Sequence, residues 1–279
     1  RASAATGADI PGVVPGVWPI PRFEQVFGLY MLLIGGLLHA PVLHDVIQPQ
    51  IDDLAHAMRP SGIGFSDFFV PDGDDTAAAL AVLRAAGHTT DLGSLQRFAD
   101  GDHYCAFPGE LQPSLSVVAH AAHALEFHDT QPNAIYIIER QASDGRWPGD
   151  KWHSSWLYTT SQAMIALEAG RHDYAVRQAA QSIINHQHND GGWGIRESTT
   201  EETAYGVIAL RLLQRRDLLT EHASRALQRG EHWMLRKYQP FADSQIKLWL
   251  DKDVYRPERI ARMIELVATL PRHVIEEHI

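Results

Sequence analysis

The sequence is poor in cysteine, in basic residues and in long apolar runs. Cys105 is the one cysteine among 279 residues, so no internal disulfide can form, and we expect a cytoplasmic location. Acidic residues outnumber basic ones by 34 to 24, which argues against a nucleic-acid partner because phosphates are bound by Lys and Arg. The longest uncharged apolar run, Val26–Leu38, is shorter than the ~20 residues of a membrane span and is predicted to be a buried helix.

Patterns typical of β-strands are also scarce. From residue 22 onward Ala and Leu dominate and apolar residues recur every three or four positions, as they do in helices. The segment before that point is rich in proline and glycine, which predicts an extended linker over residues 1–21. Residues 22–279 are therefore predicted to form one all-α domain.

One eight-residue segment of small, mostly uncharged residues recurs along the chain, at residues 76–83, 118–125, 160–167 and 203–210. Its copies end at Leu83, Leu125, Leu167 and Leu210, at spacings of 42, 42 and 43 residues. Such segments are typical of buried helices, whereas the stretches between them, such as Glu221–Lys237, are amphipathic. The alternation fits an open solenoid or a closed α/α toroid with two rings of helices. Because the repeated helices carry so little charge, we predict the toroid.

The regular spacing predicts which side chains meet at one end of the inner helices. Asp74 occupies the same position of the repeat as Tyr158 and Glu201, and His120 occupies the same position as Tyr205. We expect one rim of the toroid to gather Asp72, Asp74, Asp75, His120, Trp156, Tyr158, Glu201, Glu202 and Tyr205.

Three carboxyl groups lie within four residues, directly before a predicted inner helix. A single aspartate there would be explained as a helix cap, but Asp72, Asp74 and Asp75 exceed what capping needs. Crowded carboxyl groups cannot all ionise at low cost, so one of them should keep its proton at neutral pH. A carboxylic acid held in this way can act as a general acid.

His120 is the candidate partner of this acid, because it lies two residues deeper on the neighbouring inner helix. The alternative is a buried histidine bonded to a backbone carbonyl. His120 and His123 also have the spacing of a metal pair, but no third ligand follows at a suitable distance, so no metal site is predicted in this chain.

Aromatic residues map to the same rim. Trp147 and Trp193 follow Asp-Gly turns and are expected to pack in the core, whereas Trp156, Tyr158 and Tyr205 fall beside the acids. Aromatic faces attract positive charge, by up to ~2 kcal/mol in a dry site. An acid among aromatic walls suits a reaction that makes a cation from an apolar substrate.

Several blocks of the sequence resemble one enzyme family. The run Val70–Ala77 resembles the Asp-x-Asp-Asp-Thr-Ala motif of class II terpene cyclases, and the turns at Trp147 and Trp193 resemble the Gln-Trp repeats of squalene–hopene cyclase relatives. Further blocks that resemble bacterial class II diterpene cyclases are Asp150–Ser154 with Tyr158, Glu201–Tyr205 and Leu248–Tyr255. The resemblance covers roughly residues 15–270.

The resemblance implies an isomerase that cyclises geranylgeranyl diphosphate to copalyl diphosphate, in the ent form, and retains the diphosphate. It implies that Asp74 protonates the terminal alkene, that Asp72 and Asp75 support it, and that His120 hydrogen-bonds to it. The implied substrate-binding residues are Lys151, which would contact the diphosphate, and Trp156, Tyr158 and Tyr205.

Two features depart from the family pattern. Members carry a second, γ-type helical domain whose acidic motif binds Mg²⁺ with the diphosphate, and nothing here resembles it. We therefore expect residues 22–279 to be the acid-bearing β-type domain alone, inactive by itself, with the Mg²⁺ ligands elsewhere. A homodimer is left open. Gly16 replaces the asparagine that plant ent-type enzymes use for deprotonation, so the base is also left open.

Two other functions fit parts of the same pattern. An α/α-toroid glycoside hydrolase would also use aspartates and aromatic walls, but it needs two carboxylates that face each other across a cleft. A non-catalytic helical-repeat scaffold would leave the rim acids separately solvated. Three carboxyl groups within four residues favour the cyclase.

Overall fold

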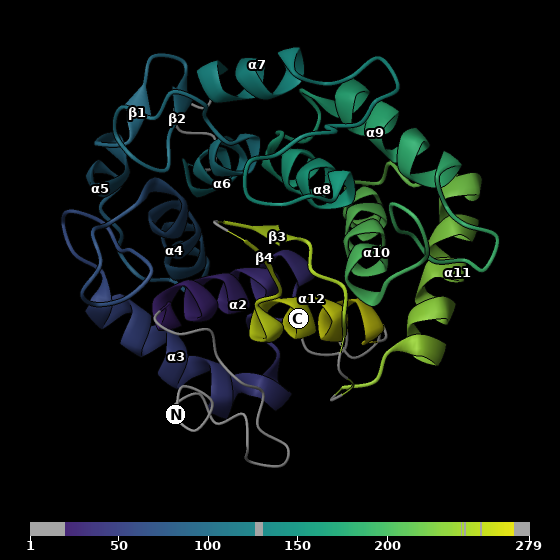
Figure 1. Ribbon diagram of the computed structural model, residues 1–279, viewed down its shortest axis with the longest axis horizontal. Helices are drawn as coiled ribbons and strands as arrows, with labels where there is room; N and C mark the ends of the chain where they lie inside the picture. The colour runs from purple at the N-terminus through teal and green to yellow at the C-terminus, as the bar shows by residue number, and fades with distance from the viewer. Residues whose placement is uncertain (1–19, 126–130, 241, 243, 252, 271–279) are drawn as a thin grey trace.

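Helices arranged in two concentric rings make up the fold of the computed structural model, which describes residues 20–125, 131–240, 242, 244–251 and 253–270 (Figure 1). The inner ring contains α2 (Pro21–Gly35), α4 (Gly73–Ala85), α6 (Leu115–Leu125), α8 (Trp156–Ala166), α10 (Thr200–Arg215) and α12 (Glu258–Thr269). The outer ring contains α3 (His44–Ala57), which follows the 3-10 turn η1 (Pro41–Leu43), and α5 (Gly93–Gln96), α7 (Gln131–Glu139), α9 (Asp173–Asn185) and α11 (Glu221–Lys237). The predicted all-α toroid is confirmed.

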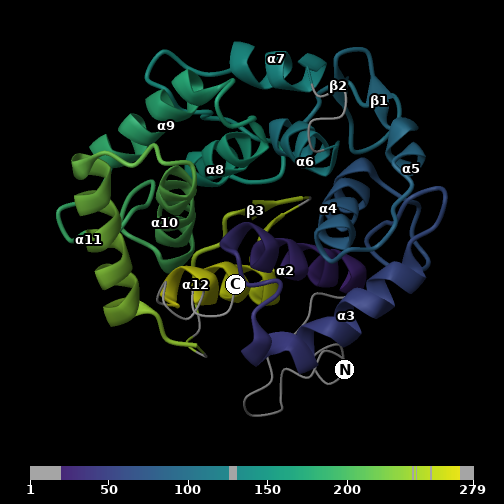
Figure 2. The same cartoon turned by 180° about the vertical axis from the view of Figure 1, so that it is seen from behind.

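The inner ring is closed, which excludes the open solenoid. Each inner helix packs against the next one in chain order, and α12 packs against α2, so the first and last members meet (Figure 2). The described residues also form two short antiparallel hairpins: β1 (Ala99–Asp100) pairs with β2 (His103–Tyr104), and β3 (Trp249–Leu250) pairs with β4 (Val254–Tyr255).

The boundary between the predicted linker and the first helix needs a correction. Residues 1–19 lie outside the described part of the chain, but Pro21, the last residue of the predicted linker, is the first residue of α2. Proline suits this position because its fixed φ is helical and the first N–H groups of a helix have no intrahelical partner. The buried helix predicted at Val26–Leu38 is α2, which ends where Gly36 adopts a left-handed conformation with φ of 79°.

The two matching tryptophan turns fasten outer helices to inner ones. Trp147 donates its Nε1–H to the carbonyl of Ile137 in α7 (2.7 Å) and its backbone N–H to Oγ1 of Thr160 in α8 (3.0 Å). Trp193 makes the same two kinds of bond, to α9 and to α10. Both indoles are fully buried, as expected for core residues.

Arginines bind the C-terminal ends of the inner helices. The carbonyl groups there have no partner within their own helix, and cations suit this end of the helix dipole. The bonds run from Arg84 to Ala124 in α6, from Arg215 to Ile34 in α2, from Arg216 to Leu167 after α8, and from Arg211 to Val267 and Ala268 in α12. Three of these arginines tie neighbouring inner helices together at the end opposite Asp72, and Arg215 reaches past α12 to join α10 to α2.

The β3–β4 hairpin reaches into the centre of the ring (Figure 1). It is attached to the segment before α8, because the N–H of Leu250 donates to the carbonyl of Trp152 (2.9 Å) and the N–H of Ser154 donates to the carbonyl of Leu248 (2.8 Å). Trp249 is 2% exposed and packs edge-on against Phe27 of α2. The hairpin thus covers the rim at which the site residues were predicted.

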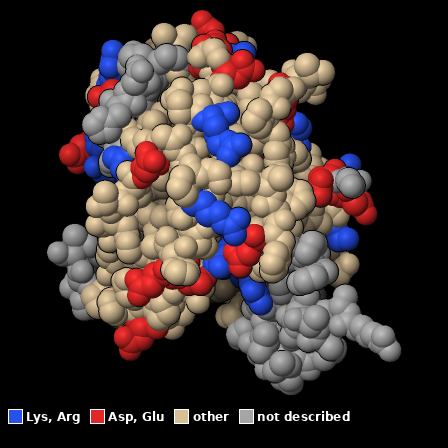
Figure 3. Space-filling model, turned by 90° about the vertical axis from the view of Figure 1, so that its left-hand side faces the viewer, with Lys and Arg blue, Asp and Glu red and all other residues tan. Residues whose placement is uncertain are grey.

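The outer surface carries a groove that is separate from this rim. The groove has a volume of about 790 Å³ and opens along α2, α3 and α12. None of the predicted site residues lines it. The side of the molecule in Figure 3 shows charged residues of both signs among larger uncharged areas. Within the described ranges, no helix has the length and apolar character needed to cross a membrane.

Candidate active site

The acidic segment forms the N-terminal turn of α4. Asp72 caps the helix, since its Oδ1 accepts the N–H of Asp75 at 2.8 Å. The N–H of Gly73 donates to the carbonyl of Ala106 at 2.8 Å, and a Cβ at Gly73 would lie 2.1 Å from the carbonyl oxygen of Cys105. Only glycine therefore allows this close approach of the two backbones, which fixes the turn against the segment after β2.

Burial separates the three carboxyl groups. Asp72 and Asp75 are 1% and 0% exposed, whereas the side chain of Asp74 is 15% exposed. Burial raises the pKa of Asp72 to about 7, and burial together with the charge of Asp72 raises the pKa of Asp75 well above its ordinary value. A side-chain hydrogen bond between Asp75 and Asp72 raises the pKa of Asp75 further, because the protonated carboxyl group of Asp75 is the donor. Folding therefore favours the protonated form of Asp75.

Asp75→Asn should therefore stabilise the protein at neutral and higher pH. A carboxyl group whose pKa is raised by folding takes up a proton when the chain folds, so its contribution to stability falls as the pH rises above the unfolded pKa of ~3.9. We expect a melting temperature about 2–6 °C higher at pH 8 and a smaller gain at pH 5, measured by calorimetry. A melting temperature at pH 8 that equals or falls below that of the wild type would contradict the burial argument.

His120 contacts Asp74 directly. Its Nδ1 lies 2.6 Å from Oδ1 of Asp74, and the ring is fully buried between α4 and α8. Nε2 lies 3.3 Å from Oε1 of Gln162, which can only accept, so Nε2 carries a proton. In the described part of the chain, the hydrogen bond of the Asp74 carboxyl group is made by Oδ1, and Oδ2 has no hydrogen-bond partner. The predicted contact is present, and the alternative of a backbone carbonyl partner is wrong.

Aromatic rings surround this pair. Tyr30 and Phe27 of α2 lie edge-on to His120, with ring centroids 5.0 and 5.4 Å away. Tyr158 lies 6.4 Å from His120 on the other side and 5.2 Å from Tyr205. Both tyrosines are buried, as an aromatic wall requires.

Comparison with known proteins agrees with this geometry. Residues 113–240 match the family described as squalene-hopene cyclase C-terminal domain. The chain is 48% identical, over 97% of its length, to (+)-kolavenyl diphosphate synthase of Herpetosiphon aurantiacus, of which it covers 52%. It is 33% identical, over 95% of its length, to ent-copalyl diphosphate synthase of Streptomyces sp. (strain KO-3988), of which it covers 52%.

A solved structure adds the fold. That of ent-copalyl diphosphate synthase from Streptomyces platensis superimposes with a TM-score of 0.83 at 31% identity, over 98% of this chain and 54% of the other. The chain belongs to the bacterial class II terpene cyclases. It spans about half the length of the curated relatives it matches. The type II terpene cyclase MstE from Scytonema shares the fold, with a TM-score of 0.72 at 15% identity.

One predicted substrate contact of this cyclase domain lies outside the aromatic group. The ring of Trp156 packs against His186 after α9 (5.2 Å) and against the guanidinium of Arg146 (5.2 Å). Trp156 is the first residue of α8, and its side chain lies on the outer-ring side of that helix, which the spacing along the chain did not reveal. Of the three predicted aromatic contacts, Tyr158 and Tyr205 therefore lie together and Trp156 lies apart from them.

Lys151 of the cyclase domain is held by neighbouring side chains. Its ammonium forms an ion pair with Glu110 and lies 4.8 Å from the ring centroid of Trp152. The preceding residue, Asp150, accepts the N–H of Ser116 at 3.0 Å and so binds the first turn of α6. Lys151 is thereby fixed near the N-terminal ends of the inner helices, and its predicted contact with a diphosphate stays a prediction.

Two residues near the site were not singled out from the sequence alone. Gln162 bonds to His120 and follows it by 42 residues, so the repeat spacing contained a signal for it. His153 stacks on Tyr158, with ring centroids 4.3 Å apart. It comes from the loop before α8, where the repeat gives no register, and only the family resemblance pointed to its block.

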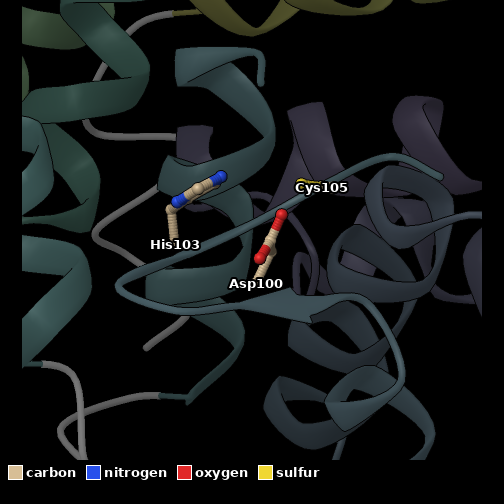
Figure 4. A group of neighbouring side chains, drawn as sticks. All are labelled: Asp100, His103 and Cys105. Atoms are coloured by element: carbon tan, nitrogen blue, oxygen red, sulfur yellow. The ribbon is translucent and has the colours of Figure 1, made fainter. Parts of the chain in front are cut away.

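The residues of this rim do not suit a divalent cation. Mg²⁺ prefers ionised carboxylates, and burial raises the pKa of two of the three acids on α4. A second group, Asp100, His103 and Cys105, brings three possible ligands within 4.8 Å of one another beside the β1–β2 hairpin (Figure 4). However, Nδ1 of His103 is bonded to Asp102 at 2.8 Å, and burial raises the pKa of the Cys105 thiol. Mg²⁺ remains an expectation for residues outside this chain.

Proposed function

We propose that the chain is the acid-bearing domain of a class II diterpene cyclase, which converts geranylgeranyl diphosphate into a cyclised diphosphate without releasing the diphosphate group. The observation that carries the proposal is the contact between Asp74 and His120 among buried aromatic rings. Copalyl diphosphate, in the ent form, is the product expected from the sequence. Kolavenyl diphosphate is the second candidate, because the relative at 48% identity is named for it.

The proposed reaction starts with a proton transfer from Asp74. In this arrangement His120 donates from both ring nitrogens, from Nε2 to Gln162 and from Nδ1 to Oδ1 of Asp74, so Oδ2 of Asp74 carries the proton that passes to the terminal alkene. The alkene electron pair forms the new C–H bond and leaves a tertiary cation, which the next alkene attacks to close a ring. The faces of Tyr158 and Tyr205 would stabilise the positive charge, and proton loss would end the sequence.

The test is an incubation of the full-length protein with geranylgeranyl diphosphate, followed by phosphatase treatment and mass analysis of the alcohols. We expect cyclised alcohols with the mass of geranylgeraniol, and retention times against reference compounds distinguish copalol from kolavenol. Recovery of geranylgeraniol alone would reject the proposal in favour of a binding scaffold, and hydrolysis of a glycoside panel would favour the glycoside hydrolase.

Lys151→Ala should weaken substrate binding more than it slows the reaction. A lysine that holds a diphosphate which does not react contributes to the ground state and the transition state alike, so its loss raises KM and leaves kcat nearly unchanged. We expect KM to rise about tenfold, in steady-state assays with geranylgeranyl diphosphate. A fall in kcat at constant KM would instead place Lys151 in the chemical step or in the fold.

A further inference from the structure

Glu201, near the start of α10, is the centre of a buried polar cluster that the proposed protonation does not use. Its Oε1 accepts the Nε1–H of Trp249 at 2.8 Å and the hydroxyl of Tyr205 at 3.3 Å, and its Oε2 accepts from Arg256 at 2.7 Å. Nε2 of His153 lies 3.5 Å from the same Oε1. Burial acts to raise the pKa of Glu201, but His153 and Arg256 outweigh it and hold the pKa below its ordinary value, so this buried carboxyl group is ionised.

The partners of Glu201 come from different parts of the chain and meet around one ring. Trp249 belongs to the β3–β4 hairpin, Tyr205 to α10, and His153 to the loop before α8. Their ring centroids lie 5.4, 5.2 and 4.3 Å from that of Tyr158. One carboxylate therefore sets the position of three rings that enclose a fourth.

The cluster also holds the hairpin in place. The Trp249 indole is the side chain by which the hairpin enters the centre of the ring, and its one polar atom is bonded to Glu201. A hydrogen bond to an ionised acceptor is shorter and stronger than a neutral one, and it is stronger still where water is excluded. Loss of the charge on Glu201 would therefore loosen the hairpin and the aromatic wall together.

We propose that Glu201 is a positioning residue which, through Trp249, Tyr205 and His153, sets the shape of the aromatic wall and so determines which cyclised products form. This inference rests on the proposed function. Glu201 has no contact with Asp74 or His120, so the first protonation does not depend on it. The later steps do, because the geometry of the wall decides how the cation folds, whether water reaches it, and where its proton is lost.

The variant Glu201→Gln tests the proposal, because it keeps the shape of the side chain and removes its charge. In the full-length protein we expect consumption of geranylgeranyl diphosphate to stay within about tenfold of the wild type, while isomeric and hydroxylated alcohols join the main product. Indole N–H signals in a ¹H–¹⁵N NMR spectrum give a second readout. Trp249→Phe assigns the signal of Trp249, which should move upfield in Glu201→Gln, and Glu197→Gln, an exposed glutamate, is the matched control that should change neither readout.

Each outcome bears on the proposal. An unchanged product profile, an unmoved Trp249 signal, or complete loss of substrate consumption in a folded variant would overturn it. If Glu201→Gln does not fold, Tyr205→Phe and Trp249→Phe, which each remove one bond to Glu201, must give the same new products or the proposal fails. If the wild-type protein makes no cyclised product, the proposed function fails by itself, while the Trp249 signal still tests the anchoring role of Glu201.

Discussion

Replacement of Asp74 by alanine should abolish cyclisation of geranylgeranyl diphosphate and leave the fold intact. General acids typically contribute ~10²–10⁴-fold to a rate, and we expect a loss of at least ~10⁴-fold because water is too weak an acid to protonate an alkene. The fold should survive, because the cap of α4 is Asp72 and the side chain of Asp74 is partly exposed. Product formation by mass spectrometry and the melting temperature measure the two effects.

The matched control for this experiment is Asp45→Ala. Asp45 is also in the first turn of a helix, α3, but its side chain is fully exposed and far along the chain from the site. Its turnover should equal that of the wild type. An Asp74→Ala protein that keeps a tenth of wild-type turnover would remove Asp74 from the role of acid.

His120→Ala should produce the second largest loss, about 10²–10³-fold in turnover. The imidazole bonds Oδ1 of Asp74 at 2.6 Å and is itself fixed by Gln162, so it orients the carboxyl group and stabilises the carboxylate that remains after proton transfer. His120→Asn should retain part of the activity, because an amide can still hydrogen-bond to Oδ1. Rates under single-turnover conditions measure these losses.

A double variant distinguishes this role from a general effect on folding. If His120 acts only through Asp74, the Asp74→Ala/His120→Ala protein should be no slower than Asp74→Ala alone, since residues that act as a unit are not additive. His120→Ala turnover within threefold of the wild type, in a protein with an unchanged melting temperature, would contradict the pairing.

The ring and the acid's partner could be predicted because both depend on one spacing. A repeat of 42 or 43 residues returns the chain to the same height of the ring at each inner helix, so the spacing alone predicts that His120 lies beside Asp74. The same spacing applied once more would have reached Gln162. Register along parallel helices is thus information that the sequence contains.

Rotation about a helix and contacts made by loops were not predictable in this way. Trp156 has the correct height but lies on the outer-ring side of α8, because height along the chain does not set the direction of a side chain at the first turn. The partners of Glu201 lie in a hairpin and a loop without periodicity, and Trp249 follows it by 48 residues with no repeated pattern between them.

The protonation of the acidic cluster illustrates a third limit. Crowding predicts that one of three neighbouring carboxyl groups keeps its proton, but which one depends on burial. Asp72 and Asp75 are buried, whereas Asp74 remains partly exposed beside His120. The sequence shows that three carboxyl groups are crowded together, but it does not show the packing that buries two of them and leaves the third partly exposed.

The joint between α12 and α2 gives the ring a seam. The other joints of the inner ring connect helices that follow one another along the chain, whereas this joint connects the two ends of the described sequence. Contacts between distant segments form late in folding, and regions joined by such contacts open before the whole domain unfolds. Amide hydrogens of α2 and α12 should thus exchange with solvent earlier than those of α6 and α8. Such local opening would turn the closed ring into a C shape, with its gap beside the β3–β4 hairpin that covers the acid.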